Sequence, residues 1–468
     1  MLYLSPDTAL SLAQLLPAFA WLVCLSGVVW WLGRSRDEPR WLYLGFASRM
    51  AAGLLLGVLY LYYYTEGDVT SYYNWGRYLS GLMIDDPLLA LRVYVPSFFS
   101  KASGLSSGGQ AVEQLDAAGH AASGFRSFFW ENEAAFFTAR YVGLLSLLGF
   151  QSFWAMAILN AGVSVGAAWL LYRSLRGCCP PRLLWGLLFL YPSLVLWTSG
   201  HHKDTLTLLG FAGTVYAARQ LLGARQPLLG WLRSLAVLGL SLWLVYAVRF
   251  SMAAALAGCL PLWAVWRYSR PLAVPYRVGV RAATVLLGLL VLLLVRFNGM
   301  DLATFSHVLY KALREEKAKP VAAGEPVGYL APLELPGFEP DFLSALRQVP
   351  RVFVYVFFEP LRFGHSALIT ISSLEGVAYW CLVAWLLVRG VRRGWPGWRQ
   401  PILVFCFVFA LGFGLFVGLS VPVVGSMVRY RIYAMLCLAV GMAILSSYSG
   451  RDPNRSVQDS DRSRNGSF

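Results

Sequence analysis

Charged residues are scarce in this sequence, and several motifs that would assign a function directly are absent from it. Asp, Glu, Lys and Arg make up 13% of the 468 residues, against 57% hydrophobic residues. This balance is too apolar for a soluble globular protein. The phosphate-binding pattern GxxxxGK[ST] does not occur, which argues against an ATP-driven pump. No apolar segment carries a regular ladder of arginines, which argues against a voltage sensor.

Cysteine and histidine are also few, and their spacing predicts neither a metal site nor a disulfide framework. The adjacent pair Cys178-Cys179 has no partner motif. The other five cysteines lie within apolar segments, where packing is the expected role: Cys24, Cys259, Cys381, Cys406 and Cys437. His201 and His202 are adjacent, so on a helix they point about 100° apart. No HExxH motif is present, and we expect neither a metal nor a cofactor.

Long apolar segments are abundant instead. A bilayer core of about 30 Å requires about 20 apolar residues per helix. The segments are continuously apolar, unlike the alternating strands of an outer-membrane barrel. The sequence therefore predicts an all-α polytopic membrane protein with about 11 transmembrane helices. The predicted spans are 9–32, 41–63, 152–171, 183–198, 205–222, 228–248, 252–266, 278–295, 367–388, 402–421 and 433–448.

Basic residues gather at alternate ends of these spans, as the positive-inside rule requires of cytoplasmic loops. This distribution explains the net charge of +15 without a nucleic-acid partner. It predicts an external N-terminus and a cytoplasmic C-terminus. The first apolar segment has no basic residue before it and no small-residue cleavage site after it, so we do not expect a removable signal peptide.

The spans and loops predict one transmembrane domain over residues 1–450, followed by a disordered cytoplasmic tail over 451–468. Two long loops are expected on the external side, 65–151 and 296–364. In the first loop, 134–150 is apolar but short and contains Arg140, which predicts an interfacial or re-entrant helix. In the second loop, the aromatic run 352–358 is too short to span and predicts another interfacial helix.

Two carboxylates, Glu66 and Asp68, follow the second span directly and are our candidates for catalytic residues. A carboxylate is costly within lipid but tolerable at a helix end. There it could act on a substrate held by lipid. The alternative interpretation is that both acids merely mark a solvated helix end, and this stretch alone does not decide between the two.

Several polar residues at the external ends of later spans could converge with these acids. The candidates for substrate or phosphate binding are His201, His202, Lys203, Asp204, Arg249, Arg429 and Arg431. Glu359, Arg362 and His365 could join them. External arginines run against the positive-inside trend, and a guanidinium offers a bidentate fork to phosphate. The alternative for any one of them is a salt bridge to an acid of the external loops.

Aromatic and acidic residues elsewhere leave similar alternatives open. Tyr72, with Tyr73 and Trp75 near it, could stack on a sugar, although such aromatics more often form interface belts. Glu375 is a lone acid within a span, where it could face a cavity or hold a structural hydrogen bond.

A pattern at the end of the fourth predicted span and in the loop after it resembles the GT-C class of integral-membrane glycosyltransferases. It reads Pro192-Ser193, then Trp197-Thr198-Ser199-Gly200, then Lys203-Asp204. An acid after an early span and a long first external loop with interfacial helices are also similar to that class. Two features differ from it: the acid follows the second span rather than the first, and the WWD-type motif of oligosaccharyltransferases is absent.

This resemblance implies a sugar donor linked to polyprenyl phosphate, a glycan or lipid acceptor of the cell envelope, and transfer on the periplasmic face of a bacterial inner membrane. It implies that Asp68, with Glu66 second, is the general base toward the acceptor hydroxyl. It further implies that Lys203, Arg249 and Arg429 hold the lipid phosphate as it leaves.

Two other functions remain open at this point. A polysaccharide polymerase or ligase of the O-antigen kind would use arginine and histidine residues of a late external loop, for which 296–364 is the candidate. A transporter or flippase for lipid-linked glycans would show inverted repeats and broken helices near the midplane. Neither feature is evident in the sequence, which does not identify a protein partner.

Overall fold

The computed structural model describes residues 6–34, 39–64, 67–95, 106–119, 132–223, 226–294, 342–359, 361, 367–421 and 424–447. All regular structure within these residues is α-helical. Helices are the expected form for apolar segments, because each backbone N–H and C=O group is satisfied within the segment and none is left facing lipid.

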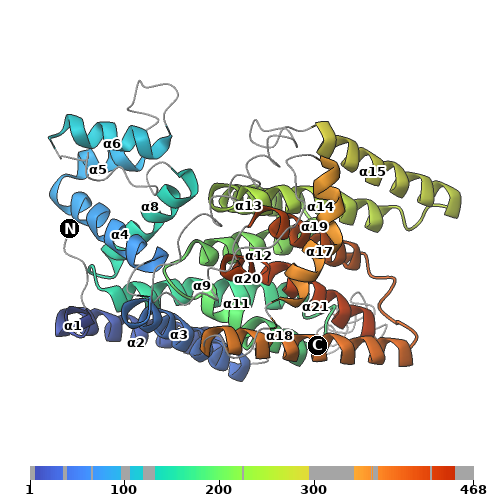
Figure 1. The fold of residues 1–468 in the computed structure, drawn as a ribbon, viewed down its shortest axis with the longest axis horizontal. Helices are drawn as coiled ribbons and strands as arrows, with labels where there is room; N and C mark the ends of the chain where they lie inside the picture. Colours follow the sequence, from blue (N-terminus) through green and yellow to red (C-terminus); the bar gives the residue numbers. More distant parts are fainter. Residues whose placement is uncertain are drawn as a thin grey trace, which may run out of the picture. The chain divides into compact units, whose positions relative to one another are not determined.

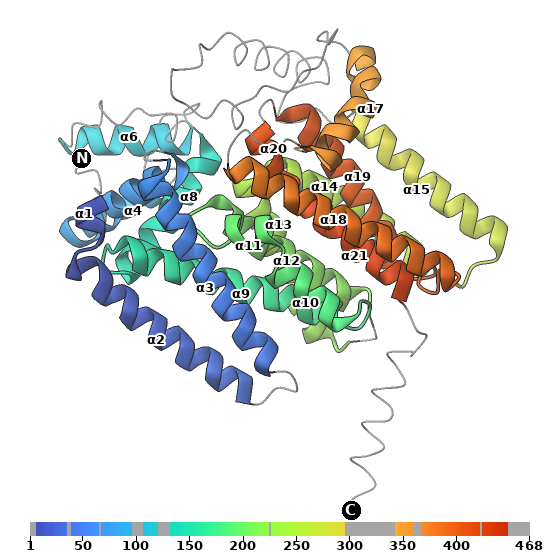
Figure 2. The same ribbon diagram turned by 60° about the horizontal axis from the view of Figure 1, so that its bottom comes forward.

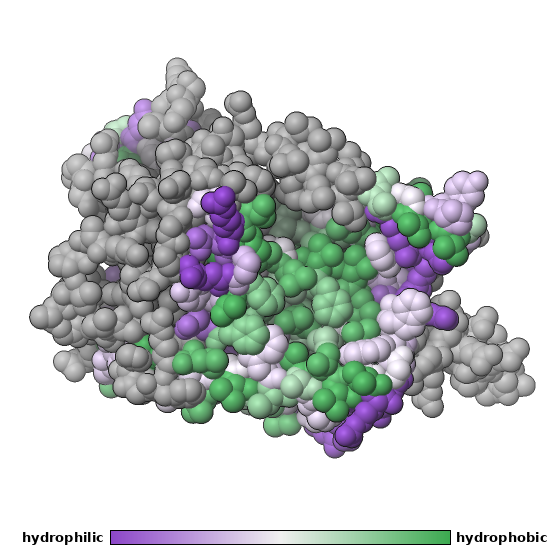
Figure 3. All heavy atoms as spheres, turned by 45° about the vertical axis from the view of Figure 1, so that its right-hand side comes forward, coloured by the Kyte–Doolittle hydropathy of each residue, from purple (hydrophilic) through white to green (hydrophobic). Residues whose placement is uncertain are grey.

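Seven of the helices are long and apolar enough to cross a bilayer, and each coincides with a predicted span. The prediction of an all-α, multi-pass membrane protein is therefore confirmed, whereas the larger number of about 11 spans stays a prediction. The seven are Leu12–Arg34, Arg40–Tyr62, Phe153–Leu175, Leu228–Val248, Phe250–Tyr268, Ile369–Arg392 and Ile402–Ser420. The face of the molecule drawn in Figure 3 carries a broad apolar area with hydrophilic residues along its margins.

The sequence predicts one transmembrane domain, and the contacts of the chain divide it into two compact units that we describe in turn. The first unit comprises Met1–Leu171 with Leu188–Ala253, and the second Tyr172–Leu187 with Ala254–Phe468. The boundaries fall within three helices, α9 (Phe153–Leu175), α10 (Pro181–Phe189) and α14 (Phe250–Tyr268).

The first unit contains most of α9 and a set of further helices. They are α1 (Pro6–Ala9), α2 (Leu12–Arg34), α3 (Pro39–Tyr62), α4 (Asp68–Asp85), α5 (Pro87–Tyr94), α6 (Ser107–Ala117), α8 (Glu133–Leu148), α11 (Pro192–Trp197), α12 (Lys203–Leu221) and α13 (Leu228–Val248). Figures 1 and 2 show α2 beside α3, and these two helices pack against each other. The closest approach is at Gly33, where a Cβ atom would lie 2.7 Å from the Tyr43 ring.

Two of the helices between α4 and α9 pack on α4. Helix α8 lies against α4, and the hydroxyls of Ser80 and Ser146 are hydrogen-bonded at 2.9 Å across this contact. Arg140 of α8 donates to the carbonyl of Tyr94 at the end of α5, at 2.7 Å. The segment 134–150, predicted to be an interfacial or re-entrant helix, is helical up to Leu148 as part of α8; its position relative to a membrane stays a prediction.

The predicted span 183–198 is wrong. Residues 183–198 do not form one helix, because α10 ends at Phe189 and α11 begins at Pro192. Proline has no N–H to continue the helix and forces the residue before it out of the α region. Tyr191 is accordingly extended, with φ −69° and ψ 107°. The break sends the chain into the polar loop that precedes α12.

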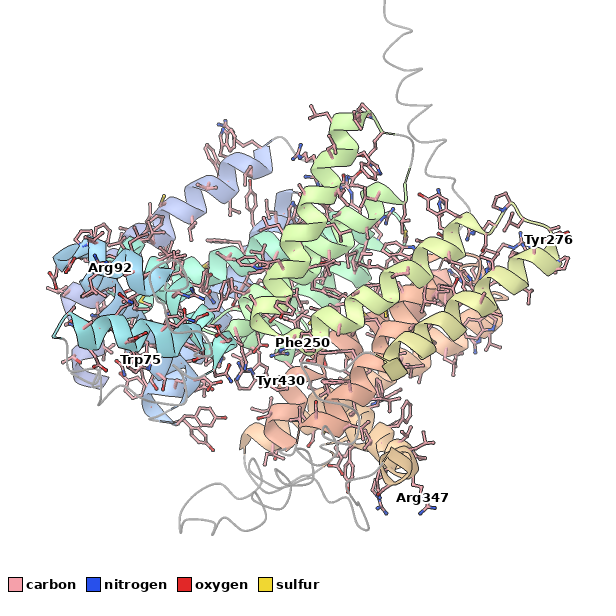
Figure 4. The ribbon with its side chains drawn as sticks, turned by 90° about the horizontal axis from the view of Figure 1, so that it is seen from above. Trp75, Arg92, Phe250, Tyr276, Arg347 and Tyr430 are labelled. Atoms are coloured by element: carbon pink, nitrogen blue, oxygen red, sulfur yellow. The ribbon has the colours of Figure 1, made fainter. Side chains whose placement is uncertain are left out.

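The second unit contains most of α14 and a bundle formed by the C-terminal helices. They are α15 (Val274–Leu294), α17 (Phe342–Phe358), α18 (Ala367–Arg392), α19 (Ile402–Ser420), α20 (Val424–Tyr430) and α21 (Ile432–Ser447). Helix α21 packs against α18 and α19, and α17 packs against α19. Tyr276 and Arg347, labelled in Figure 4, lie on α15 and α17. The predicted interfacial segment 352–358 forms the last part of α17.

Candidate functional site

The chemically distinctive part of the first unit is the loop Thr198–His202, which joins α11 to α12 (hereafter the 198–202 loop). It is deeply buried, and buried backbone groups require hydrogen-bond partners. The Asn160 side chain of α9 donates to the Gly200 carbonyl and, at 2.7 Å, to the Thr205 hydroxyl. Thr205 in turn donates to the Thr198 carbonyl at 2.6 Å. These bonds tie the loop to α9 and α12.

Arg49 anchors the other side of this loop. Its side chain is fully buried in α3 and donates to the Thr198 hydroxyl at 2.7 Å, to the Leu188 carbonyl at 2.6 Å and to the Ser164 hydroxyl. A buried guanidinium is costly unless its donors are satisfied. Arg49 therefore connects the end of α10, the end of α11 and α9 at one point.

Glycines allow α3 to approach the same loop. A Cβ atom on Gly53 would lie 2.8 Å from the Ser199 carbonyl oxygen, and one on Gly200 would collide with Leu56. The clash at Gly53 is with backbone, which cannot move aside, so that position requires glycine; at Gly200 the Leu56 side chain would have to shift. The end of α3, which leads into Asp68, is thereby held against the loop that carries the two histidines.

Asp68 opens helix α4 immediately after a strained turn. Gly67 has φ 144° and ψ −170°, a conformation that glycine adopts readily and other residues do not. A Cβ atom there would also lie 2.7 Å from the Tyr60 ring. In the first turn of α4, the Asp68 carboxylate lies at the positive end of the helix dipole.

The Asp68 carboxylate faces the imidazole of His202. Asp68 Oδ2 lies 3.9 Å from His202 Nδ1, and the Asp68 side chain is 42% exposed while that of His202 is fully buried. The His202 ring is bordered by Tyr60 and Trp197, with ring centroids 5.6 Å and 5.8 Å away. The pair therefore combines a fixed imidazole with a carboxylate that a substrate can reach.

His201 has a different environment from its neighbour. Its ring is buried against Phe153, with centroids 5.0 Å apart. Burial lowers the pKa of His201 to about 4, and a hydrogen bond with the Phe153 backbone partly opposes this shift. His201 is therefore neutral at pH 7. Among the described residues, no three His, Cys, Asp or Glu side chains gather as a metal site would require.

Asp204 and Arg249 form a closed ion pair. Arg249 Nη2 lies 2.5 Å from Asp204 Oδ1, and the side chains are 8% and 0% exposed. The pairing follows from the close contact of α12 with α13, which brings the start of one helix beside the end of the other. Gly210 permits this contact, because a Cβ atom there would lie 2.5 Å from Val245. Small residues allow such close packing of membrane helices.

Lys203 begins α12 and is half-buried. In formal charge, the two acids Asp68 and Asp204 balance Lys203 and Arg249. The Arg249 guanidinium is already paired with the Asp204 carboxylate. We therefore expect an incoming anion to bind to Lys203 and to the N-terminus of α12. The first N–H groups of a helix attract anions, and His202 provides no side-chain cap for them.

The two remaining predicted arginines belong to the second unit. Arg431 is 5% exposed and donates to the Val356 carbonyl at 2.5 Å and to the Glu359 carbonyl. These carbonyls end α17, where a cation is favourable because it satisfies unpaired acceptors and the helix dipole. Arg429 is 7% exposed, with its guanidinium 5.9 Å from the Tyr430 ring centroid. The structure thus gives Arg431 a structural partner on α17.

The aromatic residues proposed for sugar stacking are buried. Tyr72 is 2% exposed, Tyr73 is 1% exposed and Trp75 is 7% exposed. Trp75 is labelled on α4 in Figure 4. Tyr73 donates a hydrogen bond to the Gln151 carbonyl at 3.1 Å. These rings pack α4 onto its neighbours, so stacking on a sugar would require Tyr72 to be uncovered.

Some predicted residues cannot be placed. Glu66, Arg362 and His365 lie outside the described residues, as do most of the loop 296–364 and the tail 451–468. The sequence analysis missed Asn160, Tyr60 and the anchoring role of Arg49. An Asn and an Arg within apolar segments were the available signals, since polar residues within a membrane are costly and commonly functional.

Comparison of the chain with known proteins gave no match to a family model, to a curated protein or to a solved structure.

Proposed function

We propose that this protein is a membrane glycosyltransferase that moves a sugar from a polyprenyl-phosphate carrier to a glycan or lipid acceptor. One observation carries the proposal: an accessible carboxylate, Asp68, faces a buried imidazole, His202, beside the N-terminus of α12. A base, a group that orients it and an anion-attracting helix end are the elements that transfer from a phosphate-linked donor requires.

In the proposed reaction Asp68 accepts the proton of the acceptor hydroxyl. The hydroxyl oxygen forms a bond to the anomeric carbon of the donor sugar, and the bond between that carbon and the phosphate oxygen breaks. His202 orients Asp68 from its fixed position. Negative charge develops on the departing polyprenyl phosphate, and preorganised donors stabilise such charge.

We assign contact with the departing phosphate to Lys203 and the first turn of α12. Arg249 supports this arrangement through Asp204, which it holds at 2.5 Å. This assignment differs from the sequence-based hypothesis, in which Arg249 itself held the phosphate. Arg429, a predicted phosphate ligand on α20, stays a prediction.

We also propose that the protein lies in a bacterial inner membrane with the Asp68 end of α4 on the periplasmic side. Support comes from arginines in the last turns of apolar helices, Arg34 of α2 and Arg392 of α18, because cytoplasmic loops collect basic residues. A green fluorescent protein fused to the C-terminus folds only in the cytoplasm and should be fluorescent. A dark but full-length fusion would contradict the proposed orientation.

The decisive experiment measures release of polyprenyl phosphate. Proteoliposomes receive short-chain polyprenyl-phosphate sugars as donors and an extract of envelope glycans and lipids as acceptors. The released carrier is then quantified by mass spectrometry. Asp68→Asn should lower the rate at least about a hundredfold, because it removes the base and the transfer of its proton.

Asp85→Asn is the matched control, since Asp85 is an exposed acid at the other end of the same helix and the charge change is identical. Its rate should equal that of the wild type. If Asp68→Asn retains the wild-type rate, or if the control loses as much, the proposed role of Asp68 is wrong.

A transporter of lipid-linked glycans is a second candidate, and the break between α10 and α11 favours it. Discontinuous helices are typical of transporter binding sites. A transporter would move the donor across the bilayer without releasing polyprenyl phosphate, so the same proteoliposomes distinguish the two. The third function, a polymerase of the O-antigen kind, depends on the loop 296–364, most of which lies outside the described residues.

A further inference from the structure

A second candidate binding site lies at the end of helix α18, within the second unit. A hollow of about 430 Å³ opens there, lined by Trp385, Val388, Arg389, Arg392 and Arg393. All five residues come from the last turns of α18 or directly follow it. The proposed glycosyltransferase chemistry uses none of them.

Three arginines therefore line one hollow. Within the described part of the chain, no carboxylate lies at ion-pairing distance from Arg389, Arg392 or Arg393. Arg389 is half-buried, and its guanidinium lies over the Trp385 ring, 5.2 Å from the centroid. This stacking holds Arg389 in the wall of the hollow. Like charges that line one hollow repel each other unless an anion neutralises them.

The hollow lies where a membrane-spanning helix reaches the interface. The segment Ile369–Arg392 is one of the seven candidate spans. Apolar residues in its last turns are exposed: Val388, which lines the hollow, by 50% and Val391 by 63%. Trp385 is 51% exposed, and tryptophan is enriched at the level of lipid headgroups. A cationic hollow thus adjoins an apolar face that acyl chains can cover.

We propose that this hollow binds the phosphate headgroup of an anionic phospholipid. The three guanidinium groups offer bidentate hydrogen bonds to phosphate oxygens. The adjoining apolar face accepts the acyl chains, which free phosphate lacks. The accumulation of arginine by the positive-inside rule alone requires neither a hollow nor a stacked tryptophan, and a matched control separates the two explanations.

The control is a second arginine triplet, Arg173, Arg176 and Arg182, between the end of α9 and the start of α10. All three are exposed, and they do not line this hollow. The triple variant R173Q/R176Q/R182Q removes the same charge as R389Q/R392Q/R393Q. Both proteins are purified in a neutral detergent and titrated with fluorescent phosphatidylglycerol, and binding is read as fluorescence anisotropy.

R389Q/R392Q/R393Q should weaken phosphatidylglycerol binding at least about tenfold, because each basic residue near a headgroup contributes to anionic-lipid affinity. The control triplet should stay within about twofold of the wild type. R392Q alone, at an exposed position, should weaken binding by about threefold and provides a test if the triple variant does not fold. Unlabelled phosphatidylglycerol should displace the probe, whereas zwitterionic phosphatidylcholine should not.

Three results would overturn the proposal. The first is wild-type affinity in R389Q/R392Q/R393Q, or in R392Q if the triple variant does not fold. The second is an equal loss in the control triplet, which would show a general effect of charge. The third is displacement of the probe by inorganic phosphate at concentrations as low as those of phosphatidylglycerol, which would assign the hollow to free phosphate.

Discussion

Two acid–base pairs lie near the start of α12, and they differ in almost every physical respect. Asp204 and Arg249 are 2.5 Å apart and both are buried. Asp68 and His202 are 3.9 Å apart, and the carboxylate is 42% exposed. The opposite charges of Asp204 and Arg249 are paired and shielded from solvent, so removing either one should lower the free energy of unfolding. The second pair leaves one member accessible, so altering it should affect chemistry more than folding.

The comparison shows why residue type alone does not assign function. Asp68, Asp204 and Arg249 all looked like site residues in the sequence, at the ends of predicted spans. Burial separates them, since a buried charge must be matched by a partner whereas an exposed one is solvated by water. The following predictions test this separation, from the largest expected effect on stability to the smallest.

Arg249→Met should have the largest effect. It leaves the buried Asp204 carboxylate without its guanidinium partner, and breaking a buried pair typically costs about 3–5 kcal/mol. Thermal unfolding in detergent, followed by size-exclusion chromatography, measures the loss. The double variant R249M/D204L removes both charges and should recover most of it. A loss below about 1 kcal/mol in the single variant would contradict a structural role for the pair.

His201 predicts a pH dependence of stability. Its pKa is lowered from about 6.5 in the unfolded chain to about 4 in the folded protein. The unfolded chain binds a proton first as the pH falls, so stability is complete above pH 6.5 and declines toward pH 4. The decline amounts to roughly 3 kcal/mol. His201→Gln should remove this pH-dependent loss of stability. Unfolding is measured as a function of pH for the wild type and for His201→Gln, and the difference between them separates the contribution of His201 from that of carboxylates that titrate in the same pH range.

Gly67→Ala should lower stability by about 1–3 kcal/mol, because alanine does not adopt φ 144° without strain and its Cβ atom would meet the Tyr60 ring. Gly81→Ala is the control within the same helix. No atom lies within 4 Å of a Cβ atom placed there, so it should stabilise α4 by about 0.5–1 kcal/mol. Equal effects of the two variants would contradict the strained turn before Asp68.

Asp68→Asn should have the smallest effect on stability. Partly exposed ion pairs contribute about 0–1 kcal/mol, and Asp68 is 42% exposed. Its melting temperature should therefore lie close to that of the wild type while transfer activity is lost. A melting temperature as low as that of Arg249→Met would show that both pairs contribute equally to stability, and would contradict the distinction between a structural pair and an accessible one.

Much of the fold could be predicted because helix formation in a membrane is a local requirement. Seven candidate spans coincide with predicted segments, since an apolar run must satisfy its own backbone in lipid. The break at Pro192 could have been found by the same local chemistry. Hydropathy alone favoured one continuous span over 183–198, and the proline was the local feature against it.

The candidate site residues could be listed from the sequence, but their pairing could not. The predicted set contained Asp68, His202, Asp204 and Arg249, which belong to the first unit, and also Arg429 and Arg431, which belong to the second. The sequence did not indicate that Arg249 would be paired with Asp204, nor that Arg431 would cap α17. These pairings join residues far apart in the chain.

The sequence by itself determined that this is a helical, multi-pass membrane protein with acids and bases at the ends of its spans, because hydrophobic length and charge bias are readable one segment at a time. Only the tertiary structure decided which charges are hidden and which are accessible. The burial of these charges depends on helix contacts, which involve Asn160, Arg49 and several glycines. Their effect depends on how closely distant helices approach, and no single segment of sequence contains that information.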